Sequence, residues 1–439
     1  MKTLQNYVGG SWVDITGTDS AAVTNPAAGA TIAIHPHSNN PDVDAAVAAA
    51  GAAFWDWRIT PTPTRSAMLF RYRHLVWEAQ DELASIIVEE NGKKLAEAKG
   101  EMLRTLQYIE HASAVTETMK GAVTENVGTA VDIEYIREPL GPFAIIAPFN
   151  FPAMIPLYFT WAAATGNPVI VKPSEHCLLT TIRLVELAQQ AGFPDGVVNM
   201  VLGKKTVVER HAEHPDVVGK SFVGSSEIAE TAYKLTIGHR RRCQAQGGSK
   251  NHLVVTDTAA LDRCMPNIVS SMLGNSSQRC FAGSNLVIYA SIYDEFMSRF
   301  LDGVAAFRLG HGLDEAATMG PVISPESHRR LERRSTERWP RAARCCSTGV
   351  APAGRSQPGR NQCWDPRPHR LLRGRGPEVF ILDPYAAVPT MRSISIRTRK
   401  WLSARGTSTP LSNLPSTRLL RVEHESRGSG RRQQPAARD

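Results

Sequence analysis

The sequence predicts an α/β protein with a doubly wound parallel sheet, followed by a second α/β domain. Between residues 143 and 236, apolar runs of four to six residues alternate with helical segments, which is the pattern of a parallel sheet buried on both faces. The same rhythm starts again between Asn251 and Ala305. About 330 residues are enough for two domains, each with its own core.

The first 120 residues are predicted to be mainly helical. Residues 42–58 have Ala-rich helical spacing behind Pro41-Asp42. Residues 64–91 are predicted to form one amphipathic helix, with a recurring apolar face made of Leu69, Leu75, Val76, Leu83, Ile86 and Ile87. The alternation from Val131 to Ile136 has the period of a half-buried strand.

The elements of the main sheet follow in order. Strands are expected at residues 143–146, 168–172, 197–202 and 217–223, and helices at 180–191, 207–211 and 227–236. In the second domain we expect a strand at 253–255, a helix at 261–273 and a strand at 285–289.

One uncharged stretch, between Glu138 and Lys172, is longer than the roughly 20 apolar residues that span a bilayer. One helix cannot accommodate it, because a proline in a helix interior costs about 3 kcal/mol. The stretch contains Pro139, Pro142, Pro148, Pro152, Pro156 and Pro168. A buried strand, a loop and a buried helix are predicted instead, with no membrane association.

The charge is divided unevenly along the chain. Residues 331–439 hold 22 Lys and Arg, 21 of them Arg, against 8 Asp and Glu; subtraction from totals of 50 and 42 leaves 28 and 34 in residues 1–330. The segment also holds 11 of the 28 prolines and shows no helical or strand periodicity, so we expect disorder. A GC-rich gene read out of frame would encode such a segment, and a frameshift is the preferred interpretation. A basic nucleic-acid-binding extension is the alternative, although such segments usually mix Lys with Arg.

The seven cysteines have no close pair except Cys345-Cys346, which predicts reduced thiols and no metal site. No apolar segment precedes Tyr7, which predicts a cytoplasmic chain without a secretory signal.

Three short strings occur in an order that resembles the aldehyde dehydrogenase superfamily. They are Pro148-Phe149-Asn150-Phe151-Pro152, Lys172-Pro173-Ser174-Glu175, and residues 274–281 with Cys280. The sequence at 147–156 and Ser249-Lys250-Asn251-His252 is similar to the CoA-acylating methylmalonate-semialdehyde dehydrogenases in particular. The resemblance runs from about Tyr7 to about Leu331.

This resemblance implies an NAD-binding domain in residues 1–123 and 138–249, and an oligomerisation hairpin at 124–137. A partial catalytic domain follows at 250–330, and residues 331–439 form the Arg- and Pro-rich tail outside the family pattern. The family likeness also implies a homo-oligomer, either a dimer or a tetramer.

The resemblance makes Cys280 the nucleophile of an aldehyde oxidation. A cysteine attacks only as thiolate, which a cationic neighbour such as Arg279 favours. Asn150 and the Cys280 backbone N–H would stabilise the resulting alkoxide, and loss of one such donor typically costs about a hundredfold in rate. Outside this context, Cys280 is a small core residue and Asn150 a loop residue that satisfies carbonyls. The structural cysteines are expected to be Cys177, Cys243 and Cys264.

The cofactor implied by the resemblance is NAD. Lys172 and Glu175 match the adenosine-ribose pair of the family, although an exposed ion pair at a strand end is the alternative. Gly224-Ser225 opens a helix whose first amides can hold pyrophosphate, and His176 stands where family members often carry Arg. The implied cofactor positions are Ala147, Phe149, Lys172, Glu175, His176, Gly224 and Ser225.

The string Gln244-Ala245-Gln246-Gly247-Gly248 separates two branches of the family. Hydrolytic members carry a Glu just before the Gly-Gly pair, as the general base that activates water. Neither Ala245 nor Gln246 can act as a base. The resemblance therefore implies CoA as co-substrate, which releases an acyl-CoA from the thioacyl enzyme.

A semialdehyde that bears a carboxylate needs a cation, preferably Arg. Arg104 and Arg279 match the carboxylate-binding arginines of the family. Arg104 is equally well explained as a solvated helix residue, since Thr105 replaces the usual Gly.

The implied reaction is NAD-dependent oxidation of methylmalonate or malonate semialdehyde to propanoyl-CoA or acetyl-CoA, with loss of carbon dioxide, as in valine catabolism. After Leu331 the sequence has no match to the family's Glu-Ile-Phe-Gly-Pro segment, whose Glu grips the nicotinamide ribose. An inactive remnant with only a nucleotide-binding domain is therefore an alternative. A hydrolytic aldehyde dehydrogenase and a protein with an RNA- or membrane-surface role are the others, but no nucleic-acid partner is expected.

Overall fold

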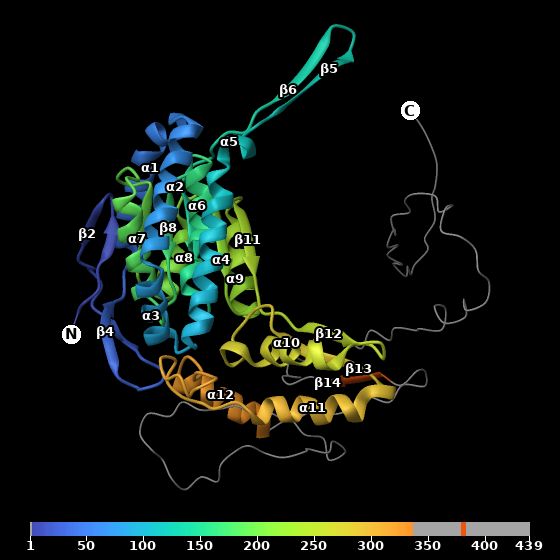
Figure 1. Cartoon of the computed structure of the whole chain (residues 1–439). Helices are drawn as coiled ribbons and strands as arrows, with labels where there is room; N and C mark the ends of the chain where they lie inside the picture. Colours follow the sequence, from blue (N-terminus) through green and yellow to red (C-terminus); the bar gives the residue numbers. More distant parts are fainter. Residues whose placement is uncertain (1, 337–378, 383–439) are drawn as a thin grey trace, which may run out of the picture. The chain divides into compact units, whose positions relative to one another are not determined.

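The computed structural model describes residues 2–336 and 379–382 (Figure 1). Its main sheet has seven strands in the order β11-β10-β7-β8-β9-β1-β2. The five parallel strands are β7 (Phe143–Ile146), β8 (Val169–Lys172), β9 (Val198–Met200), β10 (Gly219–Val223) and β11 (Arg242–Gln246). Two antiparallel strands, β1 (Asn6–Val8) and β2 (Ser11–Val13), extend one edge.

Helices cover both faces of this sheet, which confirms the predicted doubly wound architecture. Alternate residues of β8 point to opposite faces. Val169 and Val171 belong to the large apolar cluster with α2 (Thr62–Glu78), α4 (Leu95–Ser113), α6 (Pro156–Ala164) and α7 (Leu179–Gln190). Ile170 packs instead with α1 (Asn40–Ile59) and α8 (Lys205–Glu213). A smaller cluster joins β10 to α9 (Ser226–Gly238).

The strand order places the loops that follow β7, β8 and β10 at one edge of the sheet. The chain runs from β7 to β8 and β9 on one side, then returns to β10 and β11 on the other. Ile146 is in register with Lys172 on β8 and with Phe222 on β10, so the carboxyl ends of these strands are level. Ligands of such sheets bind at the carboxyl ends, beside the strand where the order reverses.

The predicted helices are present, with one error. The segment predicted as one helix over 64–91 is two, α2 and α3 (Gln80–Asn91), separated at Ala79. Asp81 and Glu82 lie in the first turn of α3, where acidic side chains favour a new helix N-terminus. Elements that no pattern identified include β1, β2 and β11, the hairpin of β3 (Ser20–Thr24) and β4 (Thr31–Pro36), and the short helix α5 (Val115–Thr118).

A hairpin of β5 (Ala122–Gly128) and β6 (Val131–Tyr135) stands away from the helices in Figure 1. The strand predicted from Val131 onward is present. The expectation that it is half-buried is wrong, because every residue of both strands is exposed in the described chain.

The second sheet contains β12 (Asn251–Val255), β13 (Gly283–Tyr289) and β14 (Val379–Leu382), in that order. It packs with α10 (Leu261–Leu273) and α11 (Tyr293–Ala305) around a separate apolar cluster. Two 3₁₀ turns, η2 (Gly274–Ser277) and η3 (Ala290–Ile292), flank β13. The strands and helix predicted for this region are confirmed, whereas the domain boundaries stay a prediction.

Two described pieces of the Arg- and Pro-rich tail have regular structure, so the expectation of disorder is wrong there. Helix α12 (Pro325–Thr336) continues past Leu331, and β14 pairs with β13. The four residues of β14 are apolar and favour strands, which explains the pairing. The rest of that prediction, and the frameshift interpretation with it, lies outside the described residues.

The uncharged stretch before Lys172 forms β7, the 3₁₀ turn η1 (Pro152–Met154), α6 and β8, as predicted. In the described parts of the chain, no helix has the length and apolarity needed to cross a membrane.

Candidate functional site

The segment that leads to Cys280 is held in an unusual backbone conformation. Asn275, Ser276 and Ser277 have φ values of 50°, 51° and 61°, in the left-handed region that residues other than glycine rarely occupy. Their neighbours fix them, since the Ser277 hydroxyl donates to Met272 O at 2.6 Å and the Ser276 hydroxyl donates to Gly320 O. Such strain persists only where the surroundings over-determine the chain, and it is common at functional sites.

Cys280 is the exposed one of the four described cysteines. Its carbonyl accepts hydrogen bonds from Asn251 Nδ2 at 2.8 Å and from the Ser249 hydroxyl, both in the string Ser249-Lys250-Asn251-His252. Cys177 is buried, and burial raises the pKa of its thiol well above the usual range. The structure therefore presents Cys280, rather than Cys177, to a substrate.

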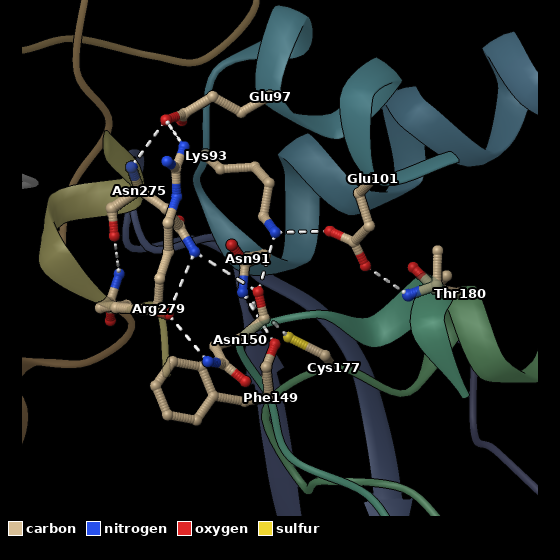
Figure 2. Close-up of polar contacts among 12 residues, drawn as sticks. Asn91, Lys93, Glu97, Glu101, Phe149, Asn150, Cys177, Thr180, Asn275 and Arg279 are labelled. Carbon is tan, nitrogen blue, oxygen red and sulfur yellow. Dashed lines mark hydrogen bonds and ion pairs between the residues drawn. The ribbon is translucent and has the colours of Figure 1, made fainter. Parts of the chain in front are cut away.

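The loop after β7 brings Asn150 to the Cys280 segment. Asn150 Nδ2 donates to Gln278 O at 2.9 Å, across 128 positions of sequence (Figure 2). Two side chains hold the backbone of this loop: Asn91 Nδ2 donates to Phe149 O at 2.9 Å, and Lys93 Nζ donates to Asn150 O at 2.8 Å. The predicted nucleophile and the predicted oxyanion donor thus lie on adjoining segments.

Three charged residues that the sequence analysis missed surround these segments. Lys93 Nζ lies 2.5 Å from Glu101 Oε2, and both side chains are buried. Burial raises the pKa of Glu101, and Lys93 and the N–H groups of Ala153 and Met154 offset part of that rise. Glu97 Oε1 accepts from the Asn275 N–H at 2.7 Å. No local pattern separates these carboxylates from a solvated helix face.

The two arginines predicted to bind the substrate carboxylate lie in different settings. Arg279 Nη2 pairs with Glu97 Oε1 at 2.7 Å, so part of its guanidinium already has a protein partner. Arg104 is exposed on α4 and donates to Gln107 Oε1 at 2.8 Å. It lies about 10 Å along the helix from Glu97, and within the described residues no contact joins the two arginines.

Tyr158 on α6 was not predicted and lies near Cys280. Burial raises the pKa of its phenol to about 12, and the Cys280 thiol and Tyr108 add to that rise. Tyr108 is four residues after Arg104 on α4, and residues at this spacing share a helix face. The exposed guanidinium of Arg104 therefore lies on the face of α4 that also carries Tyr108.

At the carboxyl end of β8, Lys172 Nζ lies 3.3 Å from Glu175 Oε2. Lys172 is only 4% exposed, so the alternative of an exposed ion pair does not describe it. Burial lowers the pKa of the Lys172 ammonium. Burial acts to raise the pKa of Glu175, but Lys172 and nearby hydrogen bonds outweigh it, and the net shift is downward. An ionised pair at this edge suits ribose hydroxyls.

The other predicted cofactor positions follow the ends of neighbouring strands. Ala147 N–H donates to Lys172 O at 3.0 Å, and the His176 ring lies edge-on to Phe149 at 6.1 Å between centroids. Burial lowers the pKa of His176.

Gly224 and Ser225 follow β10 and begin α9. Ser225 is the N-cap of α9 but makes no side-chain cap hydrogen bond, which leaves the first amides of this helix for a ligand. A Cβ at Gly224 would lie 2.7 Å from the Phe222 ring, so this turn requires glycine. An uncapped helix N-terminus at the carboxyl end of β10 agrees with the prediction that these amides hold a pyrophosphate.

Comparisons with known proteins agree with this geometry. The profile of the aldehyde dehydrogenase family matches residues 12–366, which extends past the expected limit at about Leu331. The malonate-semialdehyde dehydrogenase of Lacticaseibacillus casei is 44% identical over 331 residues, which cover 75% of this chain and 67% of that protein.

Solved structures give the same result. The methylmalonate-semialdehyde dehydrogenase of Oceanimonas doudoroffii has a TM-score of 0.76 and 33% identity, covering 80% of this chain and 72% of that one. PnpE in complex with nicotinamide adenine dinucleotide has a TM-score of 0.76 and 30% identity, covering 80% and 73%. The family profile covers most of the chain and the relatives share up to 44% of its residues, so this chain belongs to the aldehyde dehydrogenase family.

Proposed function

We propose that the chain oxidises malonate or methylmalonate semialdehyde with NAD and transfers the acyl group to CoA. The observation that carries this proposal is the 2.9 Å hydrogen bond from Asn150 Nδ2 to Gln278 O, two residues before Cys280. This contact supports a role for the Asn150 amide next to the exposed thiol of Cys280. The similarity to malonate-semialdehyde dehydrogenases supports the choice of substrate.

In the first step, the Cys280 thiolate attacks the aldehyde carbon, and the electron pair of the C=O bond moves to oxygen. The Asn150 amide and the Cys280 N–H stabilise this alkoxide, as preorganised donors do. NAD, when bound, supplies the acceptor for the hydride that leaves the former aldehyde carbon. Lys172, Glu175 and the N-terminus of α9 would hold the cofactor, and a thioester remains on Cys280.

The next steps remove carbon dioxide and the acyl group. The substrate carboxylate leaves as carbon dioxide, and the electron pair of the broken C–C bond stays on the carbon next to the thioester, which takes a proton from solvent. The thiolate of CoA then attacks the thioester carbonyl. The bond to Cys280 breaks, and Cys280 leaves as thiolate.

The residues at the end of β11 indicate which nucleophile, water or CoA, removes the acyl group from Cys280. Gln246 O accepts the Gly224 N–H at 3.1 Å, so the end of β11 lies beside the proposed pyrophosphate site. Ala245 and Gln246 offer no carboxylate there to activate water. This supports transfer to CoA over hydrolysis.

Recognition of the substrate carboxylate is assigned to Arg104 first and Arg279 second. Arg104 is exposed, and it lies on the same face of α4 as Tyr108. Arg279 already forms an ion pair with Glu97. Its remaining N–H donors could bind the substrate carboxylate only next to the negative charge of Glu97.

The test is NADH production by the full chain from malonate semialdehyde, with and without CoA, together with identification of the product. We expect one burst of NADH per site without CoA and sustained turnover with it.

A chimera that carries the C-terminal part of the Lacticaseibacillus casei relative in place of residues 331–439 should turn over faster, because it restores the Glu-Ile-Phe-Gly-Pro segment. Rapid formation of a free dicarboxylic acid without CoA would assign the chain to the hydrolytic branch. No NADH and no acyl adduct on Cys280 would favour the inactive remnant.

A further inference from the structure

A buried ion pair, Lys93 with Glu101, lies against the loop that carries Asn150 (Figure 2). We propose that this pair positions the Asn150 amide for the alkoxide. The inference rests on the proposed function, in which Asn150 is an oxyanion donor. Lys93 and Glu101 are positioning residues, since they act through the loop and do not touch the reacting atoms.

The pair holds the loop at Asn150 and just after it. Lys93 Nζ donates to Asn150 O at 2.8 Å and lies 4.6 Å from the centroid of the Phe151 ring. Glu101 Oε1 accepts from the Ala153 N–H at 2.7 Å. One ion pair therefore fixes a carbonyl and an N–H that stand three residues apart.

The loop needs such partners because it has no regular structure between β7 and η1. Buried backbone groups that cannot pair within a helix or sheet must find other partners. Lys93 is 1% exposed and Glu101 is 3% exposed, so water is excluded from both. The orientation of the Asn150 peptide, and hence of its side chain, is set by this pair.

Stability alone is a poor explanation for two buried charges. The cost of removing a Lys and a Glu from water often exceeds their attraction, and apolar replacements of similar volume are frequently neutral or stabilising. Charges that also hold a functional loop have a second reason to be present.

The same helix face also holds the Cys280 segment. Glu97 precedes Glu101 by four residues on α4, and this spacing places both carboxylates on one face. Glu97 Oε1 accepts from Arg279 Nη2 and from the Asn275 N–H, each at 2.7 Å. Asn150 Nδ2 then bridges to Gln278 O at 2.9 Å. Two consecutive turns of α4 thus set the separation between amide and thiol.

The test uses the full chain and a readout that needs neither NAD nor CoA. Malonate semialdehyde forms an adduct with Cys280 and so protects it from alkylation by iodoacetamide, which peptide mass spectrometry can follow at Cys280. In the double variant Lys93→Met/Glu101→Leu, both charges become apolar together. We expect the half-protecting concentration of semialdehyde to rise about tenfold, as in Asn150→Ala. The triple variant Lys93→Met/Glu101→Leu/Asn150→Ala should show no further rise in this concentration. The ion-pair variant, Asn150→Ala and the triple variant all lose the same interaction with the alkoxide.

The matched control is the exposed ion pair of Lys99 and Asp81, which also involves α4 (3.0 Å). Lys99→Met/Asp81→Leu should leave protection of Cys280 unchanged. Alkylation without aldehyde and the unfolding temperature should stay near those of the parent in the Lys93→Met/Glu101→Leu variant. If its unfolding temperature falls, Lys93→Met carries the test, because it removes the donor to Asn150 O while Glu101 can still accept from the Ala153 N–H.

Two results would overturn the inference differently. If Asn150→Ala weakens protection and neither variant of the ion pair does, the pair does not position Asn150, while the proposed function stands. If Asn150→Ala itself leaves protection unchanged, the oxyanion role in the proposed function fails and the positioning role fails with it.

Discussion

Cys280 differs from the other described cysteines in its surroundings. Its peptide is fixed by Asn251 and Ser249, while its side chain is exposed. Cys243 and Cys264 are partly buried, and burial raises the pKa of the Cys243 thiol. A fixed backbone with an accessible sulfur is the arrangement that nucleophilic catalysis needs.

The Cys280→Ala variant of the full chain should lose the burst of NADH and the acyl adduct. NAD affinity, measured by quenching of protein fluorescence, should change less than twofold, because Lys172 and Glu175 are untouched. Cys264→Ala is the control and should behave as the parent. Residual NADH formation by Cys280→Ala within tenfold of the parent would show that another thiol is the nucleophile.

At the scale of single elements, Glu90 joins α3 to α7. Its carboxyl is fully buried and accepts hydrogen bonds from the Leu179 N–H at 2.7 Å, the Thr180 N–H at 3.0 Å and the Thr180 hydroxyl. Burial raises the pKa of Glu90 from 4.5 to about 7 in spite of these donors. The cap of α7 is therefore a group that titrates near neutral pH.

This pKa gives a pH dependence of defined sign. Between pH 4.5 and about 7 the folded protein retains a proton on Glu90 that the unfolded chain has lost, so stability falls as pH rises across this window. The full shift corresponds to about 3 kcal/mol. In Glu90→Gln this contribution should vanish.

The measurement is the free energy of unfolding of parent and Glu90→Gln from pH 5 to 8.5. The difference between the two proteins separates the effect of Glu90 from that of His35. Burial lowers the pKa of His35 to about 4, so His35 makes stability rise with pH below its usual pKa. A difference that does not change with pH would show that Glu90 keeps an ordinary pKa.

Four strands of the main sheet were predictable from short apolar runs, as β7 and β8 show, whereas β11 is polar and was not predicted. Motif order likewise identified Asn150, Cys280, Lys172 and Glu175. The strands β1 and β2 escaped because each has only three residues. The roles of Lys93 and Glu97 could not be predicted, since their partners Asn150 and Arg279 lie 57 and 182 positions away. Two glutamates four apart look the same on a buried helix face as on a solvated one.

At the scale of the whole molecule, the β5–β6 hairpin exposes an apolar stripe. Val131, Ile133 and Tyr135 alternate on one face of β6 and are 50%, 54% and 53% exposed. Exposed, strand-forming apolar side chains of this kind mark association surfaces. We propose that this face packs against a second copy of the chain.

Ile133→Lys should therefore lower the molar mass measured by light scattering towards that of one chain, because it places a charge in the stripe. Glu134→Lys, on the opposite face of the same strand, should leave the mass of the assembly unchanged. A parent protein that is already a single chain in solution would contradict the proposal.

Helix α4 has one mechanical consequence for the whole molecule. Two segments more than a hundred residues apart, one from each sheet region, are fastened to its first two turns through Glu97 and Glu101. When thermal motion displaces the helix, it carries both segments with it, so the displacement is common to sulfur and amide. The distance between them then varies less than the position of either one, and the reaction geometry tolerates movement between the two parts of the fold.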